Sequence, residues 1–366
     1  MRFKSERDLL VEALGSASRV VASRLVGATS GVLLHLTGNH LVVTGTDLDI
    51  TVRTSIDVIG MEDGSAVVPA RLLVDAVRSL EPGAVTVQSA EESIEVSLGR
   101  ARFSLRTFAV SDYPNLPPVT GQLVSVAAGD LVQGLSQVVR AAATDDARPL
   151  LTGVLFTTEA NDLRLIATDS YRLAVRDVPG VQAIGGSHDV LVPARALQEL
   201  QRAAGSTAED VEIGVTLTDA EISFVVGPTS ISSRLIDGNY PSVLQLIPAS
   251  YPNRLRVAKD TFLTSLRRAK LLAKDSTSSV RLTMHERGVD IRTQSHDAGD
   301  VEDNVDADYT GDELTIAFNP NFLIEGVDAV PGDEVVLEMS DAVRPAMVHG
   351  VDDERFRYLL MPVRVQ

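Results

Sequence analysis

Residues 191–200 read LVPARALQEL, and a second version of this stretch, VVPARLLVDA, stands at 67–76. Both have Val-Pro-Ala-Arg from their second residue and continue as a leucine-rich amphipathic run. A degenerate third version, AFNPNFLIEG, begins at residue 317. The three versions are separated by about one third of the 366-residue chain. Since repetition at a fixed period decides the fold, the sequence predicts one unit of about 122 residues used three times.

Other segments recur in the same order. LVVTGTDLDITVR (41–53) returns as LRLIATDSYRLAVRD (163–177), and ARFSLRTFAVSDYPNLPP (101–118) returns as TSISSRLIDGNYPSVLQLIP (229–248). The third unit ends with RFRYLLMPVRV (355–365). We therefore expect three domains, 1–120, 121–250 and 251–366, joined through the proline-containing segments 113–121 and 247–253.

Each unit is predicted to open with a strand and a helix, at 7–24, 131–143 and 261–274, with Asp130 and Asp260 as N-caps of the last two. Alternating apolar runs joined at Gly38-Asn39 predict a β-hairpin. A second helix follows, with Pro69 or Pro193 in its first turn. Two helices and roughly eight strands per unit give an α+β fold, in which paired helices pack on antiparallel sheets.

The net charge of −17 argues against a protein that grips nucleic acid by overall charge attraction. The charge is unevenly spread, however. Residues 267–274 hold four cations and no acid, whereas 300–313 hold seven acids and no base. Zero cysteines exclude disulfides and thiolate metal sites. No apolar run approaches the roughly 20 residues of a membrane span, so we expect a cytoplasmic protein.

The second helices carry arginines seven residues apart. Arg71 and Arg78 share one helix face, opposite an apolar stripe made by Leu73, Ala76, Val77 and Leu80. Arg195 and Arg202 repeat this spacing. A solvated helix face often carries such pairs, but the repetition favours a shared positive surface. The third copy differs, because Asn321 and Asp328 stand at the matching places.

Catalytic and metal motifs do not emerge. The six histidines (35, 40, 188, 285, 296 and 349) have no metal-ligand spacing. Asp47 and Asp49 are expected to be solvated or capping. DVEDNVDAD (300–308) lacks the glycine of a calcium loop and is interpreted as an acidic surface loop. The sequence thus predicts no catalytic residue, metal or cofactor. A hydrolase or metal enzyme is disfavoured, and a repeat-built protein-interaction scaffold stays open as an alternative.

Several of these segments carry a family resemblance. Three repeats, ATDSYRLAV (167–175), DGNYPSVLQLIP (237–248) and MPVRV (361–365) together resemble the bacterial DNA sliding clamps, the β subunits of the replicative polymerase. SDAVRPAMVHG (340–350) points to an actinobacterial member. The resemblance implies a non-catalytic processivity factor of three tandem clamp domains, which forms half of a six-domain ring. Two chains would associate head to tail around duplex DNA, which slides through the ring without sequence specificity.

The resemblance also implies positions for the sites. At the dimer interface, Phe103 and Leu105 of an edge strand would face Leu271 and Leu272 of the partner. Cations on the inner helices would face DNA; the candidates are Arg24, Arg71, Arg78, Arg140, Arg148, Arg195, Arg202, Arg267, Arg268, Lys270 and Lys274. We expect the acids elsewhere to repel DNA from the outer surface.

Partner proteins would dock in a groove between the second and third domains. The resemblance implies that polymerases, the clamp loader and repair proteins present short peptides there. Its apolar pocket would comprise Leu151, Thr168, Leu173, Pro241, Leu246, Leu359 and Met361, and its rim Ser170, Tyr171, Arg172, Pro345 and Pro362. The family often has Gly-His where this chain has Ser170-Tyr171, and a small polar residue where it has Pro345, so the pocket mouth is expected to differ. The resemblance further implies a protein associated with the nucleoid in the cytoplasm.

Overall fold

The computed structural model describes residues 1–21, 26–145, 147–159, 162–181, 189–205, 211–273, 279–295 and 299–364. Within them the same order of elements occurs three times, which confirms the predicted repeats. The first repeat contains β1 (Arg2–Glu6), α1 (Arg7–Val20), β2 (Gly31–Thr37), β3 (His40–Thr46), β4 (Ile50–Asp57), β5 (Ile59–Glu62), β6 (Gly64–Pro69), α2 (Ala70–Arg78), β7 (Ala84–Ser89), β8 (Ser93–Leu98) and β9 (Ala101–Arg106).

The other two repeats follow the same plan, except that the described part of the second contains no strand that matches β5. The second contains β10 (Leu123–Ala127), α3 (Ala128–Val138), β11 (Gly153–Glu159), β12 (Asp162–Thr168), β13 (Arg172–Val178), β14 (Val190–Pro193), α4 (Ala194–Gly205), β15 (Glu212–Leu217), β16 (Glu221–Val226) and β17 (Thr229–Arg234). The third contains β18 (Asn253–Ala258), α5 (Lys259–Lys270), β19 (Val280–His285), β20 (Gly288–Ser295), β21 (Gly299–Val305), β22 (Ala307–Thr310), β23 (Leu314–Phe318), α6 (Pro320–Ala329), β24 (Glu334–Met339), β25 (Ala346–Gly350) and β26 (Phe356–Leu360).

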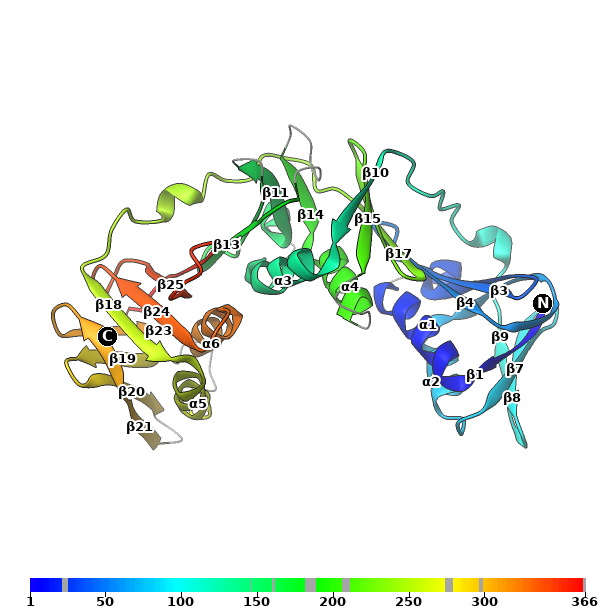
Figure 1. The fold of residues 1–366 in the computed structure, drawn as a ribbon. Helices are drawn as coiled ribbons and strands as arrows, with labels where there is room; N and C mark the ends of the chain where they lie inside the picture. Colours follow the sequence, from blue (N-terminus) through cyan, green and yellow to red (C-terminus); the bar gives the residue numbers. More distant parts are fainter. Residues whose placement is uncertain are drawn as a thin grey trace. The chain divides into compact units, whose positions relative to one another are not determined.

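The chain divides into two compact units, and the second repeat contributes to both. Unit 1 comprises 1–132 and 195–235, and unit 2 comprises 133–194 and 236–366. Unit 1 holds an eight-stranded sheet, β10-β15-β16-β17-β4-β3-β2-β6, and a five-stranded sheet, β5-β1-β7-β8-β9. Unit 2 holds a nine-stranded sheet, β14-β11-β12-β13-β26-β25-β24-β18-β22, and a four-stranded sheet, β21-β20-β19-β23 (Figure 1). Neighbouring repeats are therefore joined by shared sheets as well as by the irregular segments between them.

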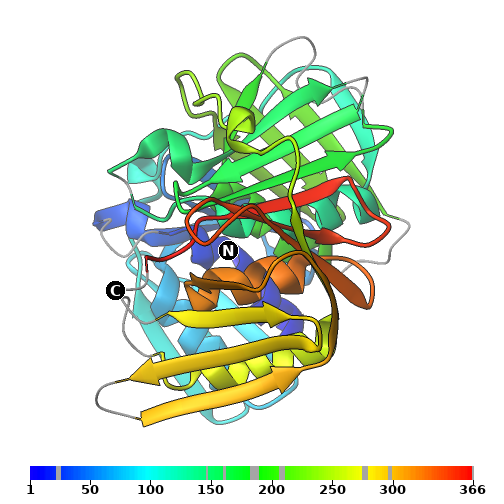
Figure 2. The same ribbon diagram turned by 90° about the vertical axis from the view of Figure 1, so that its left-hand side faces the viewer.

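The two junctions between repeats use matching strands in one register. In unit 1, β17 pairs antiparallel with β4, and Ile231 lies opposite Val52. In unit 2, β26 pairs antiparallel with β13, and Tyr358 lies opposite Ala174. The strands that match these in the remaining repeats are β9 and β21. Each is the last strand of its sheet within the described chain, and Figure 2 shows β21 at the lower edge of the four-stranded sheet.

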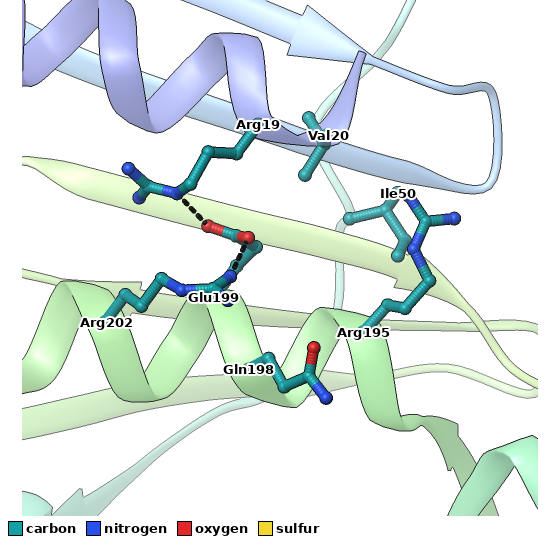
Figure 3. A pocket seen from close by; sticks show the side chains of 7 residues that line it. All are labelled: Arg19, Val20, Ile50, Arg195, Gln198, Glu199 and Arg202. Atoms are coloured by element: carbon teal, nitrogen blue, oxygen red, sulfur yellow. Dashed lines mark hydrogen bonds and ion pairs between the residues drawn. The ribbon is translucent and has the colours of Figure 1, made fainter. Parts of the chain in front are cut away.

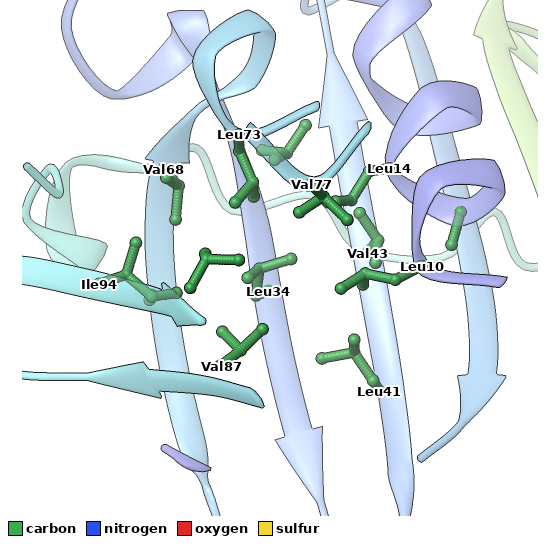
Figure 4. Packing of buried hydrophobic residues seen from close by; sticks show 14 of the residues in the cluster. Leu10, Leu14, Leu34, Leu41, Val43, Val68, Leu73, Val77, Val87 and Ile94 are labelled. Atoms are coloured by element: carbon green, nitrogen blue, oxygen red, sulfur yellow. The ribbon is translucent and has the colours of Figure 1, made fainter. Parts of the chain in front are cut away.

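The core of the first repeat explains why its helices lie where they do. Leu10 and Leu14 of α1 and Leu73 and Val77 of α2 are buried against both sheets of unit 1 (Figure 4). The two helices contact each other, as α5 and α6 do in unit 2. Arg71 and Arg78 are exposed, while the predicted stripe of Leu73, Ala76, Val77 and Leu80 is buried. Removing that stripe from water supplies about 1.5–3 kcal/mol per large side chain.

Several local predictions were wrong. Helices α3 and α5 begin before Asp130 and Asp260, which lie in the first turn rather than at the N-cap. Acids there still interact favourably with the helix dipole. Pro69 and Pro193 end the preceding strands, and the helices begin at the next residue. Only in α6 is the proline, Pro320, inside the first turn, where Asn319 caps the helix through its side chain.

The acidic segment 300–308 is another correction, because it forms strands rather than a loop. It contains most of β21 and the start of β22. The acids are accommodated because cations of the neighbouring strand and of α5 bind them: Arg292 lies 2.5 Å from Glu302 and Arg268 3.0 Å from Asp303. The described helices include none with the length and apolarity needed to cross a bilayer.

Candidate functional site

The turn between β12 and β13 shapes the first candidate site, in unit 2. Asp169 accepts hydrogen bonds at Oδ1 from the backbone N–H groups of Tyr171 (2.9 Å) and Arg172 (3.0 Å). The hydroxyl of Thr168 accepts from the N–H of Ser170 (3.1 Å) and donates to the carbonyl of Arg172 (2.5 Å). Ser170 has a φ of +78°. These local bonds hold a conformation that costs a non-glycine residue on the order of 1 kcal/mol.

Arg172 joins this turn to α6. Its guanidinium lies 2.9 Å from Asp169, forms an ion pair with Glu325, and stands 4.3 Å from the ring centroid of Phe322. Burial by itself lowers the pKa of Arg172, but Tyr358 and Glu325 more than offset this, so its pKa lies above the usual value. The arginine therefore stays charged, and it fixes the turn against the third repeat.

An apolar cluster lies beneath this turn. Leu173 and Leu359 pack with Ile166, Val175, Val243 and Met347, and with the partly buried Leu155, Tyr240, Ile247 and Tyr251. The N–H of Thr168 donates to the hydroxyl of Tyr240 at 3.0 Å. The same chain segments also carry exposed apolar side chains: Tyr171, Leu244, Leu246, Val343 and Met361. A concentration of exposed apolar side chains is typical of a binding surface.

The predicted groove residues all fall in unit 2. Those that are buried are Leu151, Thr168, Arg172, Leu173 and Leu359. Those that are partly or largely exposed are Ser170, Tyr171, Pro241, Leu246, Pro345, Met361 and Pro362. The backbone N–H of Met361 donates to the carbonyl of Tyr171 at 2.9 Å, which brings the C-terminal segment to the turn.

The second candidate site is a group of cations on the helices of unit 1. Arg71 is almost fully exposed and lies 3.9 Å from Asp75. Arg195 of α4 reaches Asp47 at 2.8 Å. Arg202, also on α4, is paired with Glu199, and Glu199 lies 2.8 Å from Arg19 of α1. Arg78 lines a cavity together with Arg19 and Arg202.

In unit 2 the candidate cations also have acidic neighbours. Arg140 lies 3.3 Å and Arg267 3.5 Å from the same carboxylate, Asp328. Arg268 lies 3.0 Å from Asp303. Arg148 donates to the hydroxyl of Ser170 at 2.8 Å, and Lys270 is exposed. The remaining two candidates, Arg24 and Lys274, lie outside the described residues.

Comparisons with known proteins agree with this architecture. The chain matches the DNA polymerase III beta subunit N-terminal domain over residues 1–117, its central domain over 126–242, and its C-terminal domain over 244–364. A beta sliding clamp of Streptomyces coelicolor is 31% identical, with 100% of both sequences covered. The chain belongs to the DNA polymerase III beta subunit family.

Relatives and solved structures support this assignment. A beta sliding clamp of Pseudomonas aeruginosa is 28% identical over the whole of both chains. The structure of a DnaN sliding clamp from Bartonella birtlesii has a TM-score of 0.91 and 30% identity, and that from Pseudomonas aeruginosa a TM-score of 0.88 and 28% identity, each over 100% of both chains. The chain is thus a sliding clamp built from three clamp domains, a non-catalytic processivity factor, and the match to Streptomyces is consistent with an actinobacterial member.

The polar groups that could have belonged to an enzyme have structural partners in this clamp. Asp47 accepts from the backbone N–H groups of Asp49 and Ile50 and so caps its turn. His40 pairs with Asp57, and His285 with Asp290. Among the described residues no cluster of histidine, aspartate or glutamate could hold a metal ion.

Of the four predicted dimer residues, one is exposed and three are partly buried. Phe103 and Leu105 are partly buried on β9, and Leu271, directly after α5, is 69% exposed beside the partly buried Leu272.

Sequence reasoning missed Glu199 and Arg19. Their signal was an acid at Glu199 on the buried face of a helix, between Ala196, Leu197 and Leu200.

Proposed function

We propose that two copies of this clamp close head to tail into a ring around duplex DNA. The observation that carries the proposal is the repeated junction between β17 and β4 and between β26 and β13. The matching strands β9 and β21 are left at sheet edges, one in each unit. A heterologous contact between β9 of one copy and β21 of the other would repeat the junction and, used twice, close the ring.

The register of the two junctions predicts the register between copies. On β9, Phe103 stands at the place that Ile231 and Tyr358 have on the junction strands β17 and β26. On β21, Val301 stands at the place of their partners, Val52 and Ala174. Phe103 should therefore lie opposite Val301 of a second copy. The neighbouring pair would then be Arg102 opposite Glu302 of a second copy. Such an opposite-charge pair favours one register over a slipped one. The exposed Leu271 and the partly buried Leu272 would be covered by the same contact.

The ring would hold duplex DNA by enclosure rather than by tight binding. The candidate cations mostly have carboxylate neighbours, which supports weak, sequence-independent contacts with phosphates. The net charge of −17 would repel DNA from surfaces away from these helices. DNA-facing cations would be Arg24, Arg71, Arg78, Arg140, Arg148, Arg195, Arg202, Arg267, Arg268, Lys270 and Lys274.

The apolar cluster and turn of unit 2 would bind partners. An extended peptide from the replicative polymerase, the clamp loader or a repair protein would place apolar side chains over Leu173, Leu359 and Met361. This site supports a tethering role, since a weakly held peptide gains effective concentration once the clamp encircles DNA. Domain boundaries at 1–120, 121–250 and 251–366, and action at the nucleoid in the cytoplasm, belong to the same proposal.

The test is retention on DNA of different topology. The protein is assembled on nicked circular DNA with a bacterial clamp loader, the mass of the free protein is measured under native conditions, and the loaded complex is separated before and after linearisation. We expect the mass of a dimer, with clamp retained on circles and lost from free ends. Equal retention on circles and linear DNA, or a monomer at micromolar concentration, would overturn the proposal and favour a protein-interaction scaffold.

A further inference from the structure

We infer that the cavity between α1 and α4 is a subsite for one backbone phosphate of duplex DNA, and that the carboxylate of Glu199 keeps its affinity low. The inference rests on the proposed function, which it deepens by assigning a residue that weakens a DNA contact. Neither Arg19 nor Glu199 belongs to the set of cations proposed above to face DNA.

The cavity lies wholly within unit 1 and has a volume of about 290 Å³. Seven residues line it: Arg19, Val20, Ile50, Arg195, Gln198, Glu199 and Arg202. Figure 3 shows Arg19 and Arg202 reaching the Glu199 carboxylate from different helices, with Arg195 beside Ile50. Three guanidinium groups therefore surround a space large enough for a phosphate group, with a single carboxylate among the lining residues.

Glu199 is held firmly at the centre of this group. Its side chain is 8% exposed, and its two oxygens bind Nε of Arg19 at 2.8 Å and Nη1 of Arg202. The side chains of Arg19 and Arg202 remain 40% and 52% exposed. A guanidinium has five N–H donors, so one carboxylate contact leaves others able to bind an anion that enters the cavity.

Arg195 is held in a similar way from the other side. Its Nη1 lies 2.8 Å from Oδ2 of Asp47, whose own side chain is 7% exposed. Asp47 is fixed because its other oxygen caps the turn between β3 and β4. The three arginines are thus preorganised by two buried carboxylates, which reduces the entropy lost when a phosphate binds.

The same carboxylates limit the strength of binding. Glu199 stands close to the place that a phosphate would occupy, so its charge repels the ligand that the arginines attract. For a protein that must move along DNA, a contact of this kind is useful because it orients the duplex and releases it quickly. A purely structural Glu199 would predict the opposite response to neutralisation, namely disordered arginines and weaker binding.

The matching place in unit 2 does not have this character. Arg140, Glu325, Asn321 and Asp328 stand where unit 1 has Arg19, Glu199, Arg195 and Arg202. Arg140 lies 3.3 Å from Asp328 and also donates to the carbonyl of Glu325. Two of the three arginines are replaced there, one of them by an acid, so the subsite is specific to unit 1.

Replacing Glu199→Gln tests the inference, because glutamine keeps the shape and removes the charge. Association of the dimer with a short linear duplex is measured across a range of salt concentrations. We expect the slope of log K against log salt to steepen by about 0.9, the value for one extra phosphate contact, and association at 0.1 M salt to tighten roughly eightfold. Diffusion of the loaded clamp along DNA should slow correspondingly.

Glu334→Gln is the matched control, because it removes one acid from an arginine pair of unit 2, Arg256 with Glu334, and neither residue lines the cavity. It should change the slope by much less than Glu199→Gln, which separates a local effect from the change in net charge. Adding Arg202→Ala to Glu199→Gln should remove the gain. An unchanged or weaker association of folded Glu199→Gln, with the melting temperature as a check, would overturn the inference.

Two further readouts separate this result from failure of the proposed function. If the wild-type protein is not retained on circular DNA, the ring proposal itself fails. If it is retained and Glu199→Gln leaves the salt slope unchanged, only the phosphate subsite is wrong. Inorganic phosphate, compared with chloride at equal ionic strength, should compete with duplex for Glu199→Gln more strongly than for wild type; equal competition would count against an anion site.

Discussion

The turn between β3 and β4 in unit 1 and the turn between β12 and β13 in unit 2 have the same backbone and different uses. Both begin with Thr-Asp, and Asp47 and Asp169 each accept two backbone N–H bonds at Oδ1. Both have a positive φ at a residue other than glycine, +80° at Leu48 and +78° at Ser170. The backbone conformation of both turns is therefore set by the threonine and the aspartate, and it is the same although the residues that follow differ.

The turns differ at the third residue after the aspartate. Ile50 is buried and lines the arginine cavity, so Asp47 is left to hold Arg195 of α4. The matching residue in unit 2 is Arg172, which takes Asp169 for itself and reaches Glu325 of α6. The helix partner differs as well, because Asn321 of α6 stands where α4 has Arg195, so Asp47 holds a cation of the helix and Asp169 holds the arginine of its own turn. The two turns thus have the same backbone conformation, and the side chains around them make different contacts.

The largest effect is expected from removing apolar side chains next to the turn between β12 and β13 in unit 2. Met361→Ala with Leu173→Ala should weaken binding of a polymerase-derived clamp-binding peptide by about 100-fold, because two anchor contacts of roughly 1.5 kcal/mol each are lost. Fluorescence anisotropy with a labelled peptide measures this. Met361→Ala alone, at an exposed residue, should retain the fold and lose about tenfold.

Thr51→Ala is the control for this prediction. Thr51 stands in unit 1 where Leu173 stands in unit 2, and its hydroxyl bonds to Thr46 at 3.0 Å. Its loss should lower stability slightly and leave peptide affinity unchanged. Peptide binding that survives the double substitution, or that falls as far with Thr51→Ala, would remove the groove from unit 2.

A smaller effect is expected where the junction strands differ. Arg176 on β13 forms a buried ion pair with Asp353 at 2.5 Å, whereas the matching Thr54 on β4 bonds to the hydroxyl of Thr229 at 3.2 Å. Asp353→Ala leaves a buried guanidinium unpaired and should cost about 3 kcal/mol. Thr54→Val should cost only about 1 kcal/mol. Calorimetry should show melting temperatures lower by roughly 6–12 °C and 2–4 °C.

The Asp353 contribution should also depend on pH. Burial by itself raises the pKa of Asp353, but Arg176 and Arg355 together outweigh it, so the pKa in the folded protein lies below the usual value. A carboxylate with a lowered folded pKa stabilises the protein above its unfolded pKa of about 3.9, and this stability is lost as pH falls through the folded value. The gap between wild type and Asp353→Ala should therefore be full near neutrality and shrink below about pH 4. A constant gap would contradict the ion-pair explanation.

Some features of the fold and of the candidate sites could be predicted from the sequence and others could not. Repeats, helix faces and the Gly38-Asn39 hairpin were predictable, because period, burial stripe and turn chemistry are local signals. The strands formed by residues 300–308 were not predictable, since their acids are tolerated only through partners such as Arg268 and Arg292 on other elements. Leu173 and Met361 came from family resemblance. Glu199 was missed because its partner, Arg19, is 180 residues away in the chain.

The smallest effect is expected at the two positive-φ residues, and it tests whether the turns are equivalent. Leucine in this region costs on the order of 1 kcal/mol, while glycine costs roughly 0.5–1 kcal/mol in the entropy of the unfolded chain. Leu48→Gly should therefore be close to neutral, stabilising by at most about 0.5 kcal/mol in urea titrations. Ser170→Gly should gain less, because Arg148 loses the hydroxyl that it contacts at 2.8 Å. A cost of more than about 1 kcal/mol for Leu48→Gly would contradict this. The half-exposed side chain of Leu48 would then contribute packing that Ser170 does not, and the two turns would have the same backbone conformation stabilised in different ways.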